Sequence, residues 1–242
     1  MLLTGKMKIA VLVFAVWAAS IYVFLTYRDF IYLWNGARGI DLSHHQGEID
    51  WSKLSYSDIS FAYIKATEGG NFVDPYFKKN WQAAKEAGLI VGAYHFFRIC
   101  KPGAMQADNF LATVPSDPGQ LPPVIDVEHE GPCNSADTPA DIEQQIITMA
   151  HHVEAKAGCK PIIYASVTYE ANLISAMDHD QSYWVPSLSW PPSFQNRNWI
   201  FWQYTATGRL KGINADIDLN VFRGSRQDLA TYLERHPCFK GA

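Results

Sequence analysis

Short apolar runs alternate with amphipathic stretches along most of the chain, and this alternation restricts the fold more than any other feature. Eight short runs are predicted to be strands, and most of them are almost continuously apolar, which is typical of strands covered on both faces. They lie at residues 38–42, 61–66, 90–96, 123–128, 161–165, 183–185, 200–204 and 217–222. Because strands and helices alternate, the sequence predicts a parallel sheet wound by crossover helices. A chain of 242 residues is long enough for one α/β barrel of this kind.

Helical patterns separate the early strands and become rarer towards the C-terminus. The helix expected at 141–157 has an apolar stripe on one face and is followed by Gly158, a common helix-stop signal. The other helices are expected at residues 75–87, 104–112, 168–177 and 225–236. Two late segments, 187–199 and 205–216, are too rich in turn residues for complete helices. We therefore expect a TIM-like α/β barrel of eight strands with hairpin-like connections near its end.

An uncharged apolar run extends from Ile9 to Thr26, after Lys6 and Lys8. Its 18 residues would form a helix of about 27 Å, close to the thickness of the hydrocarbon core of a membrane. The apolar region of a secretory signal usually has only about 7–15 residues. We expect a transmembrane signal anchor with the following domain outside the cytoplasm; the alternative is a cleaved signal peptide and a secreted domain. This interpretation gives a cytoplasmic stub, an anchor, a linker and an exported domain, at residues 1–8, 9–26, 27–36 and 37–242.

Charge and histidine spacing argue against several classes of partner. The net charge of −4 does not suit a nucleic-acid binder, which needs clustered Lys and Arg. The 8 histidines show no H-x-x-x-H or H-x-H spacing, so we expect neither a metal nor a cofactor. Aromatic residues make up 14% of the chain, which suits a large core and also stacking against sugar rings. We expect the protein to be a monomer.

The chain has four cysteines, at positions 100, 133, 159 and 238, all in the part expected to be exported. An even number in an oxidising compartment indicates two disulfides. Cys100 and Cys133 each follow the C-terminal end of a predicted strand, whereas Cys159 begins a strand and Cys238 ends the last helix. Pairing Cys100 with Cys133 and Cys159 with Cys238 keeps each bond at one end of the barrel, and the other two pairings would cross it.

Four carboxylates, Asp41, Asp126, Glu128 and Asp218, lie at the C-terminal ends of predicted strands, where barrel enzymes place their catalytic groups. Asp126 and Glu128 are two residues apart, so their side chains should point to the same side, about 6–7 Å apart. Crowded carboxylates raise the pKa of at least one of them, which produces a general acid at neutral pH. Glycoside hydrolysis uses two such groups. The alternative is that Asp126 caps a loop and Glu128 is a solvated strand end.

Six motifs occur between residues 38 and 222. They are RGIDLSHHQG at 38–47, FAYIKATEG at 61–69, GAYHF at 92–96, DVE at 126–128, WQY at 202–204 and DLN at 218–220. Together and in this order they resemble glycoside hydrolase family 25, the Chalaropsis-type lysozymes. Residues 184–188 follow the family's pattern only loosely.

The resemblance implies a barrel of five βα units followed by three strands. It implies an N-acetylmuramidase that cuts the β-1,4 bond between N-acetylmuramic acid and N-acetylglucosamine in the glycan strands of peptidoglycan. Glu128 would be the acid/base, and Asp126 would orient the substrate's acetamido group in a retaining neighbouring-group route. Asp41 and Asp218 would complete an acidic floor. Direct displacement with inversion is the alternative route.

Further residues near the strand ends are candidates for substrate binding. Four aromatic side chains could stack on sugar rings or belong to the core, and three polar side chains could hydrogen-bond the substrate. These candidates are Tyr94, Tyr164, Trp184 and Trp202, together with Lys65, Glu68 and Gln203. Lys65 and Glu68 could equally pair with each other.

Other functions stay open at this stage. A non-catalytic glycan-binding protein on the same fold is the main alternative from another class, and it would be expected to lose Glu128 or Asp126 first. A hydrolase of chitin-like chains is the nearest enzymatic alternative. Metal-dependent deacetylation of wall sugars is disfavoured by the histidine spacing.

Overall fold

The computed structural model describes residues 5–27, 35–54, 58–128, 138–166, 180–188, 191–192 and 198–239. Its strands are β1 (Arg38–Leu42), β2 (Ile59–Glu68), β3 (Phe72–Val73), β4 (Ile90–Phe96), β5 (Val124–Val127), β6 (Ile162–Ala165), β7 (Ser182–Pro186), β8 (Asn198–Gly208) and β9 (Ile217–Phe222). Its helices are α1 (Gly5–Tyr27), the 3-10 turn η2 (His44–Gln46), α3 (Trp51–Leu54), α4 (Phe77–Glu86), α5 (Gly103–Thr113), α6 (Pro139–Ala157) and α7 (Arg226–Arg235).

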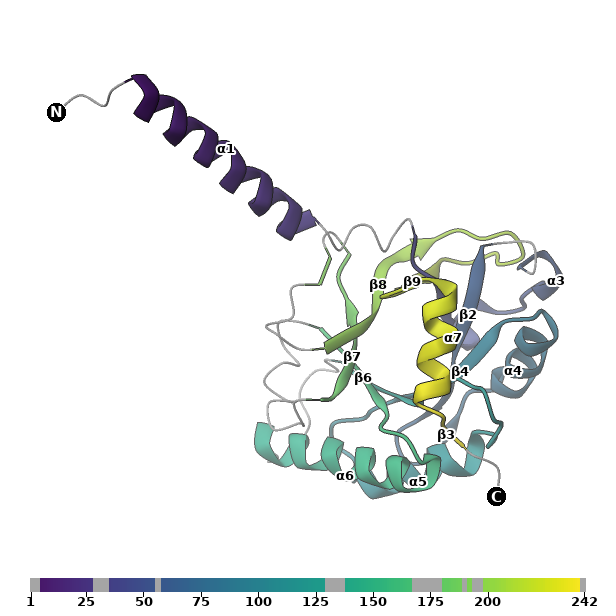
Figure 1. Ribbon diagram of the computed structural model, residues 1–242. Coiled ribbons are helices and arrows are strands. Elements are labelled where there is room, and N and C mark those ends of the chain that lie inside the picture. Colours follow the sequence, from purple (N-terminus) through teal and green to yellow (C-terminus); the bar gives the residue numbers. More distant parts are fainter. Residues whose placement is uncertain are drawn as a thin grey trace.

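The sheet closes into an eight-stranded barrel because β1 pairs with both β2 and β9 (Figure 1). The pairs from β1 through β2, β4, β5, β6 and β7 to β8 are all parallel. β9 runs antiparallel to both of its neighbours, β8 and β1. The short β3 pairs with the end of β2, outside the closed ring. The predicted α/β barrel is therefore confirmed, with one strand reversed.

Helices follow β1, β2, β4 and β5 among the described residues, whereas β7, β8 and β9 succeed one another without a described helix. This agrees with a barrel whose helices lie mainly in its first part. The helix expected at 168–177 lies outside the described residues. The sequence did not predict η2, α3 and β3, and β8 extends to Gly208, into a segment expected to be turns.

Aromatic side chains fill the barrel interior, and two glycines make room for them. A Cβ atom at Gly39 would lie 2.2 Å from the Phe61 ring, and one at Gly92 would lie 2.4 Å from the Tyr63 ring. Phe61 and Tyr63 therefore occupy space that larger residues on β1 and β4 would take. The Tyr63 ring also packs on Trp184, with centroids 4.9 Å apart. The interior is thus a packed core, as is usual for barrels of this size.

The helices cover the outside of the barrel. α5 and α6 lie side by side along one side of it (Figure 1). At the other end of the chain, Leu229 of α7 is fully buried in the same cluster as Phe61 and Phe222, so α7 packs against the interior core. A second, larger cluster lies between the outward faces of the strands and the helices.

The expected disulfide between Cys159 and Cys238 is present, with the two Cα atoms 5.2 Å apart. It joins the segment after α6 to the segment after α7, and Phe239 N–H also donates to the Ala157 carbonyl at 2.6 Å. Cys100 is disulfide-bonded as well. Its expected partner Cys133 lies outside the described residues.

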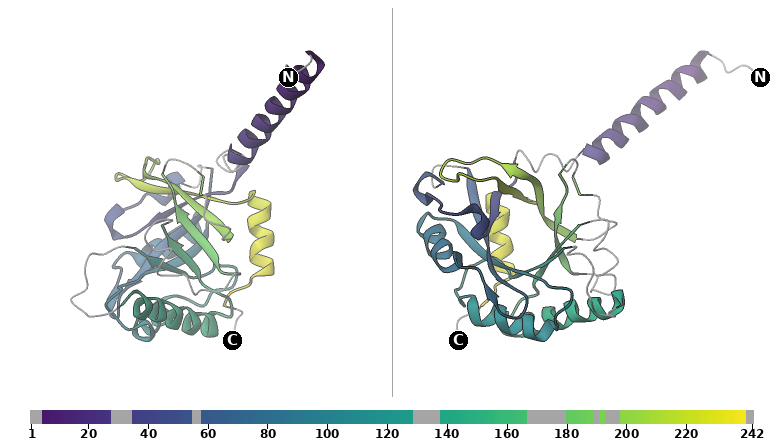
Figure 2. Two further views of the ribbon diagram at one scale, coloured as in Figure 1. Left: turned by 90° about the vertical axis from the view of Figure 1, so that its left-hand side faces the viewer. Right: turned by 180° about the vertical axis from the view of Figure 1, so that it is seen from behind.

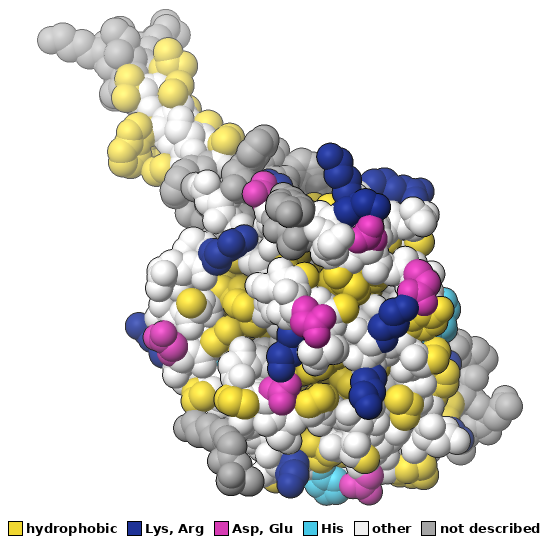
Figure 3. All heavy atoms as spheres, turned by 90° about the vertical axis from the view of Figure 1, so that its right-hand side faces the viewer, with side chains coloured by type: hydrophobic (Ala, Val, Ile, Leu, Met, Phe, Trp, Pro, Cys, Tyr) yellow, Lys and Arg dark blue, Asp and Glu magenta, His cyan; other side chains and the backbone are white. Residues whose placement is uncertain are grey.

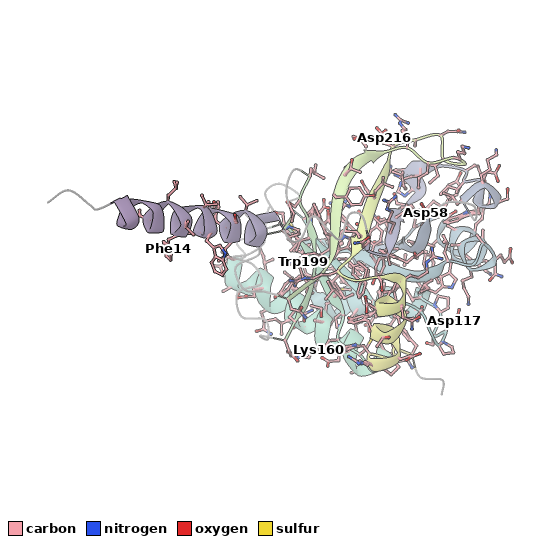
Figure 4. All side chains as sticks on the ribbon, turned by 45° about the horizontal axis from the view of Figure 1, so that its top comes forward. Phe14, Asp58, Asp117, Lys160, Trp199 and Asp216 are labelled. Carbon is pink, nitrogen blue, oxygen red and sulfur yellow. A yellow bond between two sulfur atoms is a disulfide. The ribbon has the colours of Figure 1, made fainter. Side chains whose placement is uncertain are left out.

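Helix α1 stands apart from the barrel in Figures 1 and 2. Its described side chains are exposed and mostly hydrophobic (Figure 3), and Phe14, which is 73% exposed, points away from the helix axis (Figure 4). None of the helices in the described part of the chain is long and apolar enough to span a membrane. The structure therefore does not support the transmembrane anchor expected at residues 9–26.

On the face of the barrel shown in Figure 3, basic and acidic side chains are interspersed.

Candidate active site

A cleft of about 640 Å³ opens at the C-terminal ends of the parallel strands. Such strand ends come together at one rim of the barrel, which explains why residues far apart in the sequence meet there. All four expected carboxylates line the cleft, and six of the seven expected substrate-binding residues do so too. The expected residues in the lining are Asp41, Lys65, Glu68, Tyr94, Asp126, Glu128, Tyr164, Trp184, Gln203 and Asp218.

Asp41 and Asp218 lie directly opposite each other on the antiparallel strands β1 and β9. Burial and the neighbouring charge of Asp218 raise the pKa of Asp41 well above its ordinary value, and burial also raises the pKa of Asp218. The two carboxyl groups share a hydrogen bond, which favours the protonated form of Asp41 and the ionised form of Asp218. The pair therefore holds a proton at a pH where isolated aspartates would have lost theirs.

A network of neutral polar side chains fixes Asp41. Its Oδ2 atom accepts hydrogen bonds from Asn220 Nδ2 at 2.7 Å and from Gln203 Nε2 at 3.1 Å. Gln203 Oε1 in turn accepts from the Tyr164 hydroxyl at 3.0 Å, and Asn220 Oδ1 accepts from Trp184 Nε1 at 2.8 Å. The network leaves Asp41 little freedom to rotate, and residues of four other strands hold it in place.

The other two carboxylates lie on β5 and just after its end. Asp126 is only 8% exposed and pairs in the sheet with Phe96 on one side and Tyr164 on the other, and Glu128 follows the end of the strand. Burial first, and then the charges of Asp126, Glu128 and the Asp41–Asp218 pair, raise the pKa of Tyr164 well above its ordinary value. Burial and nearby aspartates do the same to Tyr94. Both phenols therefore stay neutral and able to donate hydrogen bonds in the cleft.

The structure corrects the expectation for Trp202. This residue is 2% exposed, packs with the outer core cluster and donates its indole N–H to the Ser187 carbonyl at 2.8 Å, so it does not lie in the cleft. Trp184 does line the cleft, but it is equally buried and its ring packs on Tyr63 and Tyr164. The Trp184 indole N–H donates a hydrogen bond to Asn220, so Trp184 supports the acidic floor and does not offer an open face for stacking on sugars.

Charged and aromatic side chains form the end of the cleft at β2 and β4. Lys65 Nζ donates to Glu68 Oε2 at 2.6 Å, and Arg98 Nε donates to Glu68 Oε1 at 2.9 Å. Burial opposes ionisation of Glu68, but the hydrogen bonds from Lys65 and Arg98 outweigh it and lower the Glu68 pKa. Lys65 and Glu68 thus pair with each other, one of the two possibilities that the sequence left open.

Sequence reasoning missed several residues of the cleft. They include Ser43, His45, Gln46, Phe96, Arg98 and Ala206. Phe96 and Arg98 continue the alternation that begins with Tyr94, so the two-residue period of strands could have indicated them. Gln46 is the last residue of an unpredicted turn, η2, whose N-cap Ser43 accepts the His45 N–H.

A buried histidine holds the strand end next to Arg98. His95 Nδ1 lies 2.7 Å from Thr67 Oγ1, and its Nε2 lies 3.1 Å from Gln106 Oε1. Burial lowers the pKa of His95 to about 4, so the ring is neutral at physiological pH and positions its neighbours without carrying charge. Among the described residues, no group of three His, Cys, Asp or Glu side chains is arranged to hold a metal ion.

A parallel barrel with carboxylates gathered at its strand ends has the architecture and site of a barrel glycoside hydrolase. The family model "Glycosyl hydrolases family 25" matches residues 40–213. A family 25 glycosyl hydrolase of known structure from Bacillus anthracis is 38% identical to this chain, with a TM-score of 0.75, covering 81% of this chain and 93% of that one.

Two further relatives agree. The bacterial lysozyme of known structure from Streptomyces coelicolor is 36% identical, with a TM-score of 0.74, covering 81% of this chain and 96% of that one. Lysozyme M1 from Streptomyces globisporus is 36% identical over 208 residues, which cover 79% of this chain and 69% of the relative. The chain therefore belongs to glycosyl hydrolases family 25 and is a glycoside hydrolase.

Proposed function

We propose that this protein is a lysozyme that hydrolyses the β-1,4 bond between N-acetylmuramic acid and N-acetylglucosamine in peptidoglycan. The observation that carries the proposal is the cleft at the strand ends, where Asp126 on β5 and Glu128 just after it line the same cavity as the Asp41–Asp218 pair. The lysozymes among the relatives support the choice of substrate.

In the proposed reaction, Glu128 protonates the glycosidic oxygen as the bond to the anomeric carbon breaks. The acetamido carbonyl oxygen of the substrate attacks that carbon from the other face, and Asp126 accepts a hydrogen bond from the acetamido N–H and stabilises the cyclic cation. Glu128, now ionised, takes a proton from the water that opens the ring and restores the acetamido group. Two displacements at one carbon give net retention.

The Asp41–Asp218 pair contributes charge and position in this scheme. Ionised Asp218 adds negative potential to the floor, which favours a positively charged transition state. Asp41, held by Asn220 and Gln203, fixes the geometry of Asp218 through their shared hydrogen bond. Tyr94, which is neutral, is placed to donate a hydrogen bond to a sugar oxygen, whereas the Tyr164 hydroxyl already donates to Gln203 and can accept a hydrogen bond from a sugar hydroxyl.

The test compares the purified chain with its Glu128→Gln variant on peptidoglycan, followed by reduction of the products and mass spectrometry. We expect reduced muramic-acid ends from the parent chain and a loss of at least about 100-fold in rate for the variant, the usual scale for removing a general acid. Glu234→Gln, an exposed glutamate on α7, is the matched control and should keep full activity.

Other outcomes would favour the alternatives. Cleavage of chitin fragments but not of peptidoglycan would favour a hydrolase of chitin-like chains. Binding to peptidoglycan without products from either protein would favour a glycan-binding protein and refute the proposed activity.

We also propose that the barrel acts outside the cytoplasm, where peptidoglycan lies, with α1 as an export signal. The apolar side chains of this helix and the disulfide between Cys159 and Cys238 both support export. Fractionation of cells that produce the full chain should find the barrel outside the cytoplasm; a barrel that stays in the cytoplasm with reduced cysteines would contradict this.

A further inference from the structure

The cleft is electrically asymmetric. Among the described residues, five carboxylates and the two cations Lys65 and Arg98 line it. Both cations lie at the end formed by β2 and β4 together with one of the carboxylates, Glu68, and the other four carboxylates form the floor. The acidic floor therefore repels an anionic substrate, whereas this end attracts one. A glycan strand with charged substituents would experience a different potential at each end of the cleft.

The two cations are held around one aromatic ring. Lys65 Nζ lies 4.6 Å from the centre of the Phe96 ring, and Arg98 Cζ lies 5.4 Å from the same centre. Glu68 binds both cations and so fixes the distance between them. Lys65 is nearly buried, with 8% of its side chain exposed, whereas 44% of the Arg98 side chain is exposed. Arg98 is thus the cation that a ligand can reach.

The backbone of Arg98 is fixed as firmly as its side chain. The fully buried Gln106 accepts the Arg98 N–H at 2.8 Å and donates to the Arg98 carbonyl at 3.0 Å. The stem of the side chain lies beside Gly69, where a Cβ atom would be 3.2 Å from Arg98 Cγ, and Gly69 has a φ of +53°. A preorganised guanidinium loses little freedom on binding, and its planar shape suits a carboxylate.

We propose that Arg98, with Lys65 behind it, forms a subsite that binds a carboxylate carried by the glycan next to the cleaved bond. This proposal rests on the proposed function and makes it more specific. In peptidoglycan only every second sugar bears such a group, so a cation at one end of the cleft sets the register of the strand and selects which of the two glycosidic bonds is cut. Chitin has no carboxylate, so the subsite also favours peptidoglycan over chitin.

The carboxylate can come from two sources. In a strand with stem peptides it belongs to the peptide, because the lactyl group is then blocked as an amide. In a strand without peptides it is the free lactyl carboxylate of muramic acid. Both present the same planar anion to Arg98, and soluble fragments of each kind distinguish them.

The test measures dissociation constants by calorimetry for the full chain carrying Glu128→Gln, which prevents turnover, with and without Arg98→Gln. The ligands are four-sugar fragments with stem peptides and without them, each also as a neutral methylamide. We expect Arg98→Gln to weaken binding of at least one charged fragment about 10-fold, equivalent to about 1.4 kcal/mol, and to change binding of the neutral forms by less than about 2-fold. The charged fragment that loses affinity identifies the source of the carboxylate.

Two further variants make the result specific. Arg98→Lys should recover part of the lost affinity because it restores the charge without the planar fork. Lys85→Gln is the matched control. Lys85, on α4, is 41% exposed and ion-paired with Asp117, and it does not line the cleft. Equal losses for charged and neutral fragments, or no loss for either, would overturn the subsite. Failure of the parent chain to cleave peptidoglycan would refute the proposed activity instead, and the binding data would still decide on Arg98.

Discussion

The Asp41→Asn variant is expected to unfold at a higher temperature than the parent chain near neutral pH, although it should lose activity. Asp41 is 7% exposed, and burial together with the charge of Asp218 raises its pKa well above the ordinary value. A carboxyl group whose pKa is raised in the folded state lowers the free energy of unfolding at every pH at which the unfolded chain would have that group ionised. Asparagine keeps an oxygen for the hydrogen bonds from Gln203 and Asn220 and has no charge to bury.

The sign of the pH dependence follows from proton binding. Between the unfolded pKa of about 4 and the raised folded pKa, the folded parent binds more protons than the unfolded chain, so its stability falls as pH rises. Below this window both states are protonated and the two proteins should differ least. Each unit of elevation is equivalent to about 1.36 kcal/mol. We expect an advantage on the order of 1–2 kcal/mol near pH 7, or roughly 2–8 °C in melting temperature for a domain of this size.

Thermal unfolding followed by circular dichroism from about pH 4 to about pH 7 tests this expectation. Asp228→Asn is the control with the opposite sign, because hydrogen bonds from Ser225 lower the Asp228 pKa at the start of α7. That exchange should destabilise the fold near pH 7, and its effect should disappear at low pH. The reasoning is refuted if Asp41→Asn melts below the parent near pH 7, or if the difference between them does not grow with pH.

Two further predictions concern the scaffold. Gly39→Val should lower the free energy of unfolding by about 1–3 kcal/mol, because its Cβ would lie 2.2 Å from the Phe61 ring; an unchanged denaturant midpoint would show that the interior can repack. Replacing both Cys159 and Cys238 by serine opens a disulfide with a sequence separation of 79 and should cost about 2–5 kcal/mol in the same assay, so equal midpoints for variant and parent would disprove a stabilising role.

The barrel could be predicted because its strands are almost continuously apolar and end in turn residues. The predicted bounds of β1, β4 and β9 coincide with the observed ones. The elements that escaped prediction are short: α3 spans Trp51–Leu54 and β3 spans Phe72–Val73, too few residues to show a period. β8 extends further than expected because its far half forms a hairpin with β9, with pairs such as Thr205 with Leu219.

The sequence could predict the site residues that lie at the C-terminal ends of the parallel strands. It could not predict those whose position depends on how neighbouring strands are aligned. Asp41, Asp126 and Asp218 are strand residues, so topology alone places them on one rim. Arg98 lies in the loop after β4 and is fixed by Glu68 on β2, and only the three-dimensional pairing of these strands brings the two together. Trp202 could have been excluded earlier, because neighbours on a strand point to opposite faces and Gln203 faces inward.

The packed interior and the acidic floor depend on each other. Trp184 belongs to the aromatic core that also contains Tyr63, and it donates its N–H to Asn220, which in turn holds Asp41. The aromatic layer below the floor keeps water away from one side of Asp41, and this burial is the largest cause of its raised pKa. A barrel interior with smaller side chains would admit water, lower that pKa and release the proton that the Asp41–Asp218 pair shares. The aromatic content of the chain therefore serves the chemistry of the cleft mainly from below, through the core.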